Sequence, residues 1–187
     1  GDAAVAAMGV CTTINDLVWV AIFALMNATA IIVGKALGAG DRERAYLYAK
    51  RMMAGAVAAG VALGLLVIAV RWPLVNIFSG LSYPVRDKAQ FILLLGGMTI
   101  WFRAFNTINI VGVLRSGGDT LFSLCLDVGT LWLVGVTSTG LAALVFHWPL
   151  EWVYACTFLE EAVKMAVGIP HFKKKQWMNV LTEQPQG

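Results

Sequence analysis

Long runs of apolar residues alternate with short polar stretches along the chain. Each run is close to, or longer than, the roughly 20 residues with which a helix crosses the hydrocarbon core of a bilayer. Because lipid offers no hydrogen-bond partners, such runs form helices or closed barrels, and runs of this length are typical of helices. The pattern predicts about five transmembrane helices, at residues 3–33, 52–70, 91–114, 121–146 and 153–169.

The composition agrees with a chain embedded in a membrane. Hydrophobic residues make up 59% of the 187 positions and charged residues only 13%, whereas soluble domains carry about 25% charged residues. The mean hydropathy is +0.74. The net charge of +3 is too small and too unevenly placed to indicate a nucleic-acid partner. We therefore expect an all-α integral membrane protein.

The basic residues are distributed unequally between the two sides of the predicted bundle. The first loop, the third loop and the C-terminus carry nine of the 14 Lys and Arg, and the positive-inside rule places that side in the cytoplasm. The prediction is a multi-pass protein of a bacterial-type inner (cell) membrane, with a helical bundle over residues 1–172 and a basic cytoplasmic tail over residues 173–187. Five crossings put Gly1 on the outer face, so further helices are expected before it. The nine residues are Lys35, Arg42, Arg44, Lys50, Arg51, Arg115, Lys173, Lys174 and Lys175.

Tryptophans mark several predicted span ends, where indole rings favour the headgroup region. The sequence HFKKKQW, residues 171–177, predicts an interfacial stop with its lysines attracted to anionic lipid and its tryptophan at the membrane boundary. The interfacial tryptophans are Trp72, Trp148, Trp152 and Trp177.

One short pattern occurs twice, each time where an apolar run ends on the predicted cytoplasmic side. Residues 33–41 read VGKALGAGD and residues 111–119 read VGVLRSGGD. Glycine adopts the left-handed conformation that ends a helix, and the aspartate after it can cap the next helix. The first glycine of each copy is expected to let neighbouring helices approach closely. The pattern predicts two tight hairpins 78 residues apart, and internal repeats are common in secondary transporters. The turn residues are Gly34, Gly38, Gly40, Asp41, Gly112, Arg115, Gly117, Gly118 and Asp119.

These segments closely resemble one family of transporters. IIVGKALGAGDRERAYLYAKR and NIVGVLRSGGDT are similar to the two cytoplasmic turns in the C-terminal half of the multidrug and toxic compound extrusion (MATE) antiporters. LDVGTLWLVGV, EEAVK and FKKKQW look like the final helices of that family. The resemblance implies the last five of twelve helices, which form most of the C-terminal lobe, with the N-terminal lobe of the same protein as a partner.

The same resemblance implies a function. MATE proteins export amphipathic, often cationic drugs by alternating access in exchange for H⁺ or Na⁺, with no further cofactor. One branch carries a cation-binding acid in the third of these spans, where this chain has only Arg103. Two alternatives stay open. A flippase for lipid-linked oligosaccharides would have a cavity rich in basic residues, and a non-transporting scaffold subunit would pair all of its intramembrane charges.

Ionisable side chains inside the spans are candidates for the transport pathway, because each costs a few kcal/mol to insert. Counted at 1.5 Å per residue, Arg103 lies roughly 16–18 Å and Asp127 roughly 10–12 Å from their shared turn. An ion pair between them is predicted, with a direct role in passage as the alternative. Glu160 and Glu161 precede Lys164 by four and three residues, which predicts ion pairs on one helix face and leaves one carboxylate over.

Asp16 lies in the first span with no basic residue predicted at its depth. Desolvation disfavours the charged form of a carboxylate, so Asp16 is a candidate for a group that gains and loses a proton during transport. The alternative is an acid satisfied by a helix outside this segment. Asn15 and Asn27 are expected to line the same cavity.

Aromatic and amide side chains complete the candidate pathway. An indole near mid-span can stack on a flat cation, or simply pack between helices or face lipid; this applies to Trp19, Trp101 and Trp132. Asn106 and Asn109 share a helix face, from which they bridge helices or contact substrate. The pathway candidates are Asp16, Asn27, Trp101, Arg103, Asn106, Asn109, Asp127 and Trp132.

The sequence shows none of the patterns of an enzyme. It has no G-x-x-x-x-G-K-[ST] phosphate-binding loop, and its two histidines are 24 residues apart, without a metal-ligand spacing. No nucleophile and base can be paired from their spacing. We therefore expect neither catalysis nor a bound metal cofactor.

Overall fold

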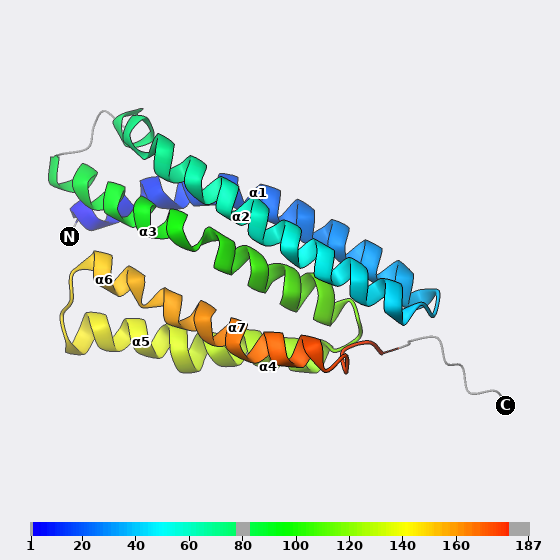
Figure 1. The fold of residues 1–187 in the computed structure, drawn as a ribbon. Helices are drawn as coiled ribbons and strands as arrows, with labels where there is room; N and C mark the ends of the chain where they lie inside the picture. Colours follow the sequence, from blue (N-terminus) through cyan, green and yellow to red (C-terminus); the bar gives the residue numbers. More distant parts are fainter. Residues whose placement is uncertain (1, 78–82, 180–187) are drawn as a thin grey trace.

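The computed structural model describes residues 2–77 and 83–179, which form helices and turns and contain no strand. Two groups of helices lie side by side (Figure 1). The first group comprises α1 (Asp2–Gly38), α2 (Arg42–Ile77) and α3 (Tyr83–Thr107). The second comprises α4 (Thr120–Thr130), α5 (Thr137–Gly140), α6 (Leu150–Ala155) and α7 (Thr157–Lys173).

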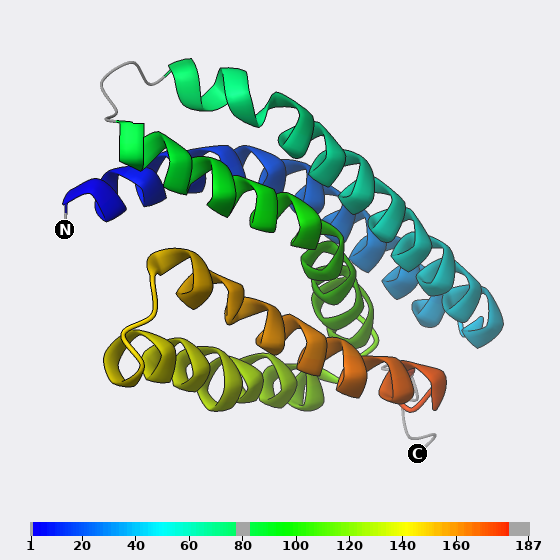
Figure 2. The same ribbon diagram turned by 60° about the vertical axis from the view of Figure 1, so that its left-hand side comes forward.

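In the described residues, three π-helical segments interrupt the helices, namely η1 (Ile108–Arg115), η2 (Leu131–Val136) and η3 (Leu141–Val145). η1 continues α3 and contacts α1, α2, α4 and α7, so it joins the two groups. Figure 2 shows the continuous helix formed by α3 and η1, in green, bending towards the second group. π-helical turns are rare and are frequent at functional sites.

Four helices in the described part of the chain are long and apolar enough to cross a membrane. They cover residues Asn15–Gly38, Arg42–Pro73, Val85–Arg115 and Thr120–Val145, and they correspond to the first four predicted spans. The fifth predicted span forms α6 and α7, which carry charged residues that face the protein interior; its crossing of the bilayer stays a prediction. The chain is an all-α membrane protein.

The two glycine turns have the same hydrogen bonds. In the first, the N–H groups of Gly40 and Asp41 donate to the carbonyls of Leu37 and Ala36. In the second, the N–H groups of Gly118 and Asp119 donate to the carbonyls of Arg115 and Leu114. This is the Schellman pattern, in which one residue takes a left-handed conformation. Gly40 and Gly118 have φ of 76° and 91°, whereas Gly38 and Gly117 do not have positive φ.

The two aspartates of the repeat differ in what they bind. Asp41 accepts a hydrogen bond from the backbone N–H of Arg44 at 2.9 Å, so it caps α2 as predicted. Asp119 makes no capping bond with its side chain. Its carboxylate instead lies 2.5 Å from Nε2 of His171 on α7. The predicted cap at Asp119 was wrong, because a partner 52 residues away takes the side chain.

Replacement of Asp41 by alanine should lower the free energy of unfolding by about 1 kcal/mol, since the cap of α2 is lost. Thermal unfolding of the purified protein in detergent measures the effect. Asp41→Asn keeps a capping oxygen and should be close to the parent protein. Equal losses in the two variants would show that the charge, not the cap, is what stabilises the turn.

Glycines set the closest contacts between helices. Gly60 and Gly64 form a G-x-x-x-G motif on α2, and a Cβ at Gly60 would lie 2.5 Å from the Cα of Trp101 on α3. A Cβ at Gly64 would collide with the carbonyl of Gly97. Such motifs let the backbones of neighbouring helices approach closely in a membrane. The close contact between α2 and α3 was not among the predictions from the sequence, although the motif could have indicated it.

The first glycines of the two turns, Gly34 and Gly112, differ in how closely a neighbouring helix approaches them. A Cβ at Gly112 would lie 3.2 Å from the side chain of Thr29 on α1, so close approach is confirmed there. Open space surrounds Gly34, where the same prediction was wrong.

The residues after α7 fold back onto the second turn. Trp177 is fully buried, and its indole N–H donates to the carbonyl of Phe172 at 3.1 Å. The backbone N–H of Asn179 donates to the carbonyl of Gly117 at 2.9 Å. The ring of Trp177 therefore packs inside the protein and does not face the headgroups as predicted. Trp72, Trp148 and Trp152 are each at least 50% exposed, and their position at the membrane interface stays a prediction. The rest of the predicted tail, residues 180–187, lies outside the described residues.

Candidate functional site

A polar cavity of about 400 Å³ lies between the two groups of helices. Side chains of α1, α3, η1, α4, η2, α6 and α7 line it. Its polar lining is concentrated on α3, α4 and α7, which otherwise carry apolar residues. Charged groups in such a position are expensive unless they pair or contact water.

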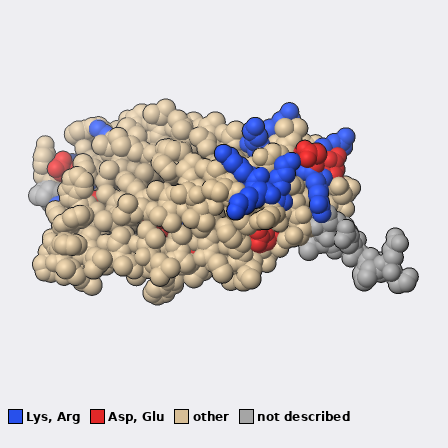
Figure 3. Space-filling model, turned by 60° about the horizontal axis from the view of Figure 1, so that its bottom comes forward, with Lys and Arg blue, Asp and Glu red and all other residues tan. Residues whose placement is uncertain are grey.

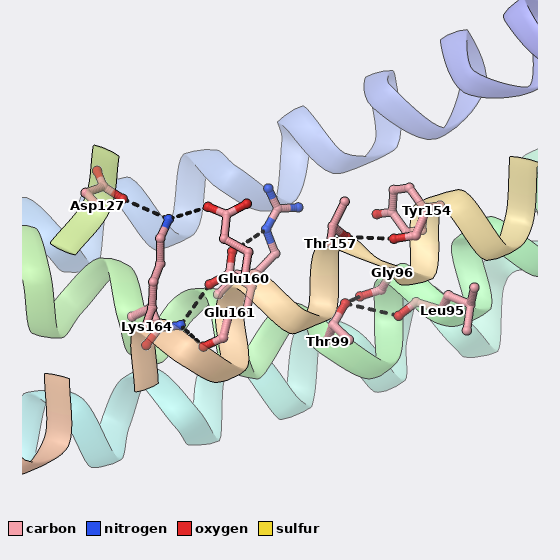
Figure 4. A network of polar contacts seen from close by, with 11 residues as sticks. Leu95, Gly96, Thr99, Asp127, Tyr154, Thr157, Glu160, Glu161 and Lys164 are labelled. Atoms are coloured by element: carbon pink, nitrogen blue, oxygen red, sulfur yellow. Dashed lines mark hydrogen bonds and ion pairs between the residues drawn. The ribbon is translucent and has the colours of Figure 1, made fainter. Parts of the chain in front are cut away.

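Lys164 is the centre of one half of this lining. Its ammonium group lies 2.8 Å from a carboxylate oxygen of Asp127 on α4 and 2.7 Å from one of Glu160, one turn earlier on α7 (Figure 4). The lysine side chain is only 11% exposed. Burial of an ammonium group is costly without partners, and two acids supply them here.

Glu161 is the centre of the other half. Its carboxylate lies 3.5 Å from Nε of Arg103 and accepts a hydrogen bond of 2.8 Å from the amide group of Asn106. Arg103 also lies over the ring of Trp19, 5.0 Å from its centroid, within the range of a cation–π contact. Through these contacts α7 is held against α3, and α3 against α1.

The predicted ion pair between Arg103 and Asp127 is not formed. Arg103 pairs with Glu161, and Asp127 pairs with Lys164. The prediction of a pair between Glu160 and Lys164 is confirmed, and the carboxylate that was left over, Glu161, finds its partner on another helix. Depth along the spans was estimated from sequence, but the direction of each side chain around its helix was not.

The lining holds one more acid than bases. Asp127, Glu160 and Glu161 face Arg103 and Lys164, so the five groups carry a net negative charge when all are ionised. Asp127 is the most accessible of the three acids, with 43% of its side chain exposed against 13% and 15%.

The neighbouring backbone makes room for these carboxylates. A Cβ at Gly135 in η2 would collide with Oε2 of Glu160. Glycine at this position therefore lets the acid pack against the π-helical segment. In the same stretch the hydroxyl of Thr137 donates to the carbonyl of Trp132, five residues earlier, at 2.9 Å.

Comparison with known families gives one match. The family model described as MatE matches residues 1–137, a range that contains both glycine turns, Arg103 and Asp127. The chain belongs to the MATE family. No curated protein matches the chain, and no solved structure matches it. The resemblance to MATE proteins that was inferred from the two turns is confirmed.

MATE proteins are transporters, and the family match covers only part of the cavity lining of this chain. The matched range ends before α7. Glu160, Glu161 and Lys164 therefore come from the part of this MATE chain that the family model does not cover. The structure shows that all three line the cavity.

The candidate pathway residues fall into two groups. Arg103, Asn106 and Asp127 line the cavity of this MATE chain. Asp16, Asn27 and Trp132 are exposed on the surface of the helices, and Trp101 packs its backbone against Gly60. On α1 it is Asn15, beside Asp16, and Trp19 that face the cavity.

Asn109 lies behind the cavity rather than on its wall. It is fully buried in η1, against Gly168 of α7, and neither polar atom of its side chain has a hydrogen-bond partner among the described residues. The shared face with Asn106 was predicted, but only Asn106 reaches the cavity lining.

Among the described residues, no group of three or more His, Cys, Asp or Glu side chains is placed to hold a metal ion. The three acids of the cavity are already engaged by lysine, arginine and amide groups.

Proposed function

We propose that this MATE chain serves the export of amphipathic or cationic drugs by antiport with H⁺ or Na⁺. The observation that carries the proposal is the cavity between α3, α4 and α7, with three acids against two bases. A net negative charge in an apolar surrounding attracts a cation strongly, because the effective dielectric constant is low.

The same charge excess supplies a basis for exchange. A proton or sodium ion that neutralises one carboxylate removes the charge that would hold a cationic drug. The two cations then compete for one site, which is the requirement for antiport. Asp127 is the carboxylate best placed for this role, since it lines the cavity and its side chain is the most exposed of the three.

Trp19 supports an aromatic, cationic substrate. Its ring already holds the guanidinium group of Arg103 at 5.0 Å. A flat drug cation can make the same contact with the ring face. Alternating access between two lobes in the cell membrane, with the C-terminus in the cytoplasm, completes the proposal; the other lobe of the transporter would close the cavity.

The flippase alternative receives less support from this site. The five charged groups of the cavity carry a net negative charge when all are ionised, and such a charge repels the phosphates of a lipid-linked substrate.

Ethidium efflux from cells that express the complete protein tests the proposal. Sodium is held constant and the proton gradient is then collapsed. Efflux that stops with the gradient supports H⁺ coupling, and efflux that stops only when sodium is removed supports Na⁺ coupling. The absence of efflux from cells with the protein in the membrane would reject drug export.

Asp127→Asn should reduce gradient-driven ethidium efflux at least about tenfold, a loss that corresponds to roughly 1.4 kcal/mol, because the amide cannot exchange a proton or a cation. Asp16→Asn is the matched control, since Asp16 is exposed on α1 outside the cavity. A strong loss in Asp16→Asn with normal efflux in Asp127→Asn would assign coupling to α1 instead.

A further inference from the structure

A second hollow, of about 600 Å³, lies between α1 and α2 next to the first glycine turn. It shares no lining residue with the polar cavity. Side chains from the last turns of α1 and the first turns of α2 form its walls, so we call it the hairpin groove.

The groove is built from one stripe on each helix. On α2, Arg44, Tyr48 and Arg51 follow at spacings of four and three residues and therefore share one face. On α1, Ile32 and Lys35 share a face in the same way, with small side chains between Lys35 and the turn. Each stripe thus combines cationic groups with apolar or aromatic ones.

The charges of the groove are mostly unpaired. Arg44 is held by Asp41, with 3.1 Å between Nε and the carboxylate. Lys35 and Arg51 have no acidic partner within ion-pair distance among the described residues. The three cations and one acid of the groove leave an excess positive charge, which attracts an anion.

The groove also has a definite position with respect to the apolar spans. Lys35 lies in the last turn of α1, where the first membrane-length helix ends. Arg51 directly precedes Met52, with which the apolar stretch of α2 begins. Lys and Arg gather at this end of the molecule (Figure 3). The groove therefore spans the expected headgroup zone, with Ile32 and Met52 towards the hydrocarbon.

We propose that the hairpin groove binds an anionic phospholipid of the surrounding leaflet. The phosphodiester would contact Lys35 and Arg51, and the first carbons of the acyl chains would cover Ile32 and Met52. Basic pockets between transmembrane helices on the cytoplasmic side are known to suit such headgroups. The apolar end of the groove favours a lipid over free phosphate, because only the lipid has acyl chains that can cover Ile32 and Met52.

Binding of lipid to the purified full chain tests the proposal, with native mass spectrometry as the readout. Phosphatidylglycerol is the probe, and phosphatidylcholine, which is zwitterionic and has no net charge, is the reference. Each of Lys35→Gln and Arg51→Gln should raise the dissociation constant for phosphatidylglycerol about fivefold, the factor expected for one cation near a membrane surface. The double variant should lose most binding. Ala39→Phe, which fills the groove without a change in charge, should weaken binding similarly.

Arg42→Gln and Lys174→Gln are the matched controls, since both side chains are exposed at the same end of the molecule and outside the groove. Both should bind phosphatidylglycerol as the parent does. Equal weakening in these controls, or unchanged binding in the double variant, would overturn the proposal. So would displacement of the lipid by an excess of inorganic phosphate, because a site for free phosphate needs no acyl chain.

Discussion

Replacement of Lys164 by methionine is expected to lower the free energy of unfolding by about 3 kcal/mol and to abolish efflux. The ammonium group is held between Asp127 and Glu160 at 2.8 and 2.7 Å. Removal of one partner of a buried ion pair leaves an uncompensated charge and costs about 3–5 kcal/mol. The lower end applies because Asp127 is 43% exposed and can turn to water.

Thermal unfolding in detergent and ethidium efflux are the two measurements for this variant. Lys174→Met is the control, because Lys174 is an exposed lysine a few turns further along. The prediction would be wrong if Lys164→Met and Lys174→Met had the same unfolding temperature.

A triple variant separates stability from transport. Lys164→Met combined with Asp127→Asn and Glu160→Gln leaves no unpaired charge at this half of the cavity, so stability should return to near that of the parent protein. Efflux should stay absent, because the exchangeable carboxylate is lost. Recovery of efflux in the triple variant would show that these charges hold the helices together and do not couple transport.

The sequence was sufficient to predict the parts of this protein that depend on local chemistry. The two turns follow from glycine and aspartate at fixed offsets from the ends of apolar helices, and Gly40, Gly118 and Asp41 behave as predicted. Asp119 does not, because His171 approaches it from 52 residues away. A capping rule that considers only neighbouring residues cannot predict that a side chain of another helix will bind the aspartate instead.

The cavity shows a second limit of prediction from sequence. Arg103 and Asp127 were chosen as pathway candidates, and both line the cavity, but they do not pair with each other as predicted. The depth of a residue in the membrane follows from counting residues along its helix. The direction in which its side chain points can be predicted only where the faces of the helix differ in polarity. In a membrane, lipid and protein are similarly apolar, so the hydrophobic pattern does not supply that difference.

Trp177→Ala is expected to lower the free energy of unfolding by about 3–5 kcal/mol, the range for loss of a buried tryptophan. The indole is fully buried between Phe172, on which it stacks at 5.7 Å, and Gly117 of the second turn. Trp148→Ala is the matched control, because that side chain is 50% exposed and should cost far less. Thermal unfolding in detergent measures both.

Gly117→Leu tests the same contact between Trp177 and the second turn, but by a change in the turn. Any side chain at this position would collide with the ring of Trp177, so the segment after α7 could no longer cover the turn. Because Lys175 of that segment also pairs with Glu43 on α2 at 3.0 Å, its displacement should loosen both hairpins. Combination of Gly117→Leu with Trp177→Ala should then cost less than the sum of the two changes, since they break one contact. Additive losses would show that the tryptophan and the turn stabilise the protein independently, as the interfacial position predicted from the sequence would require.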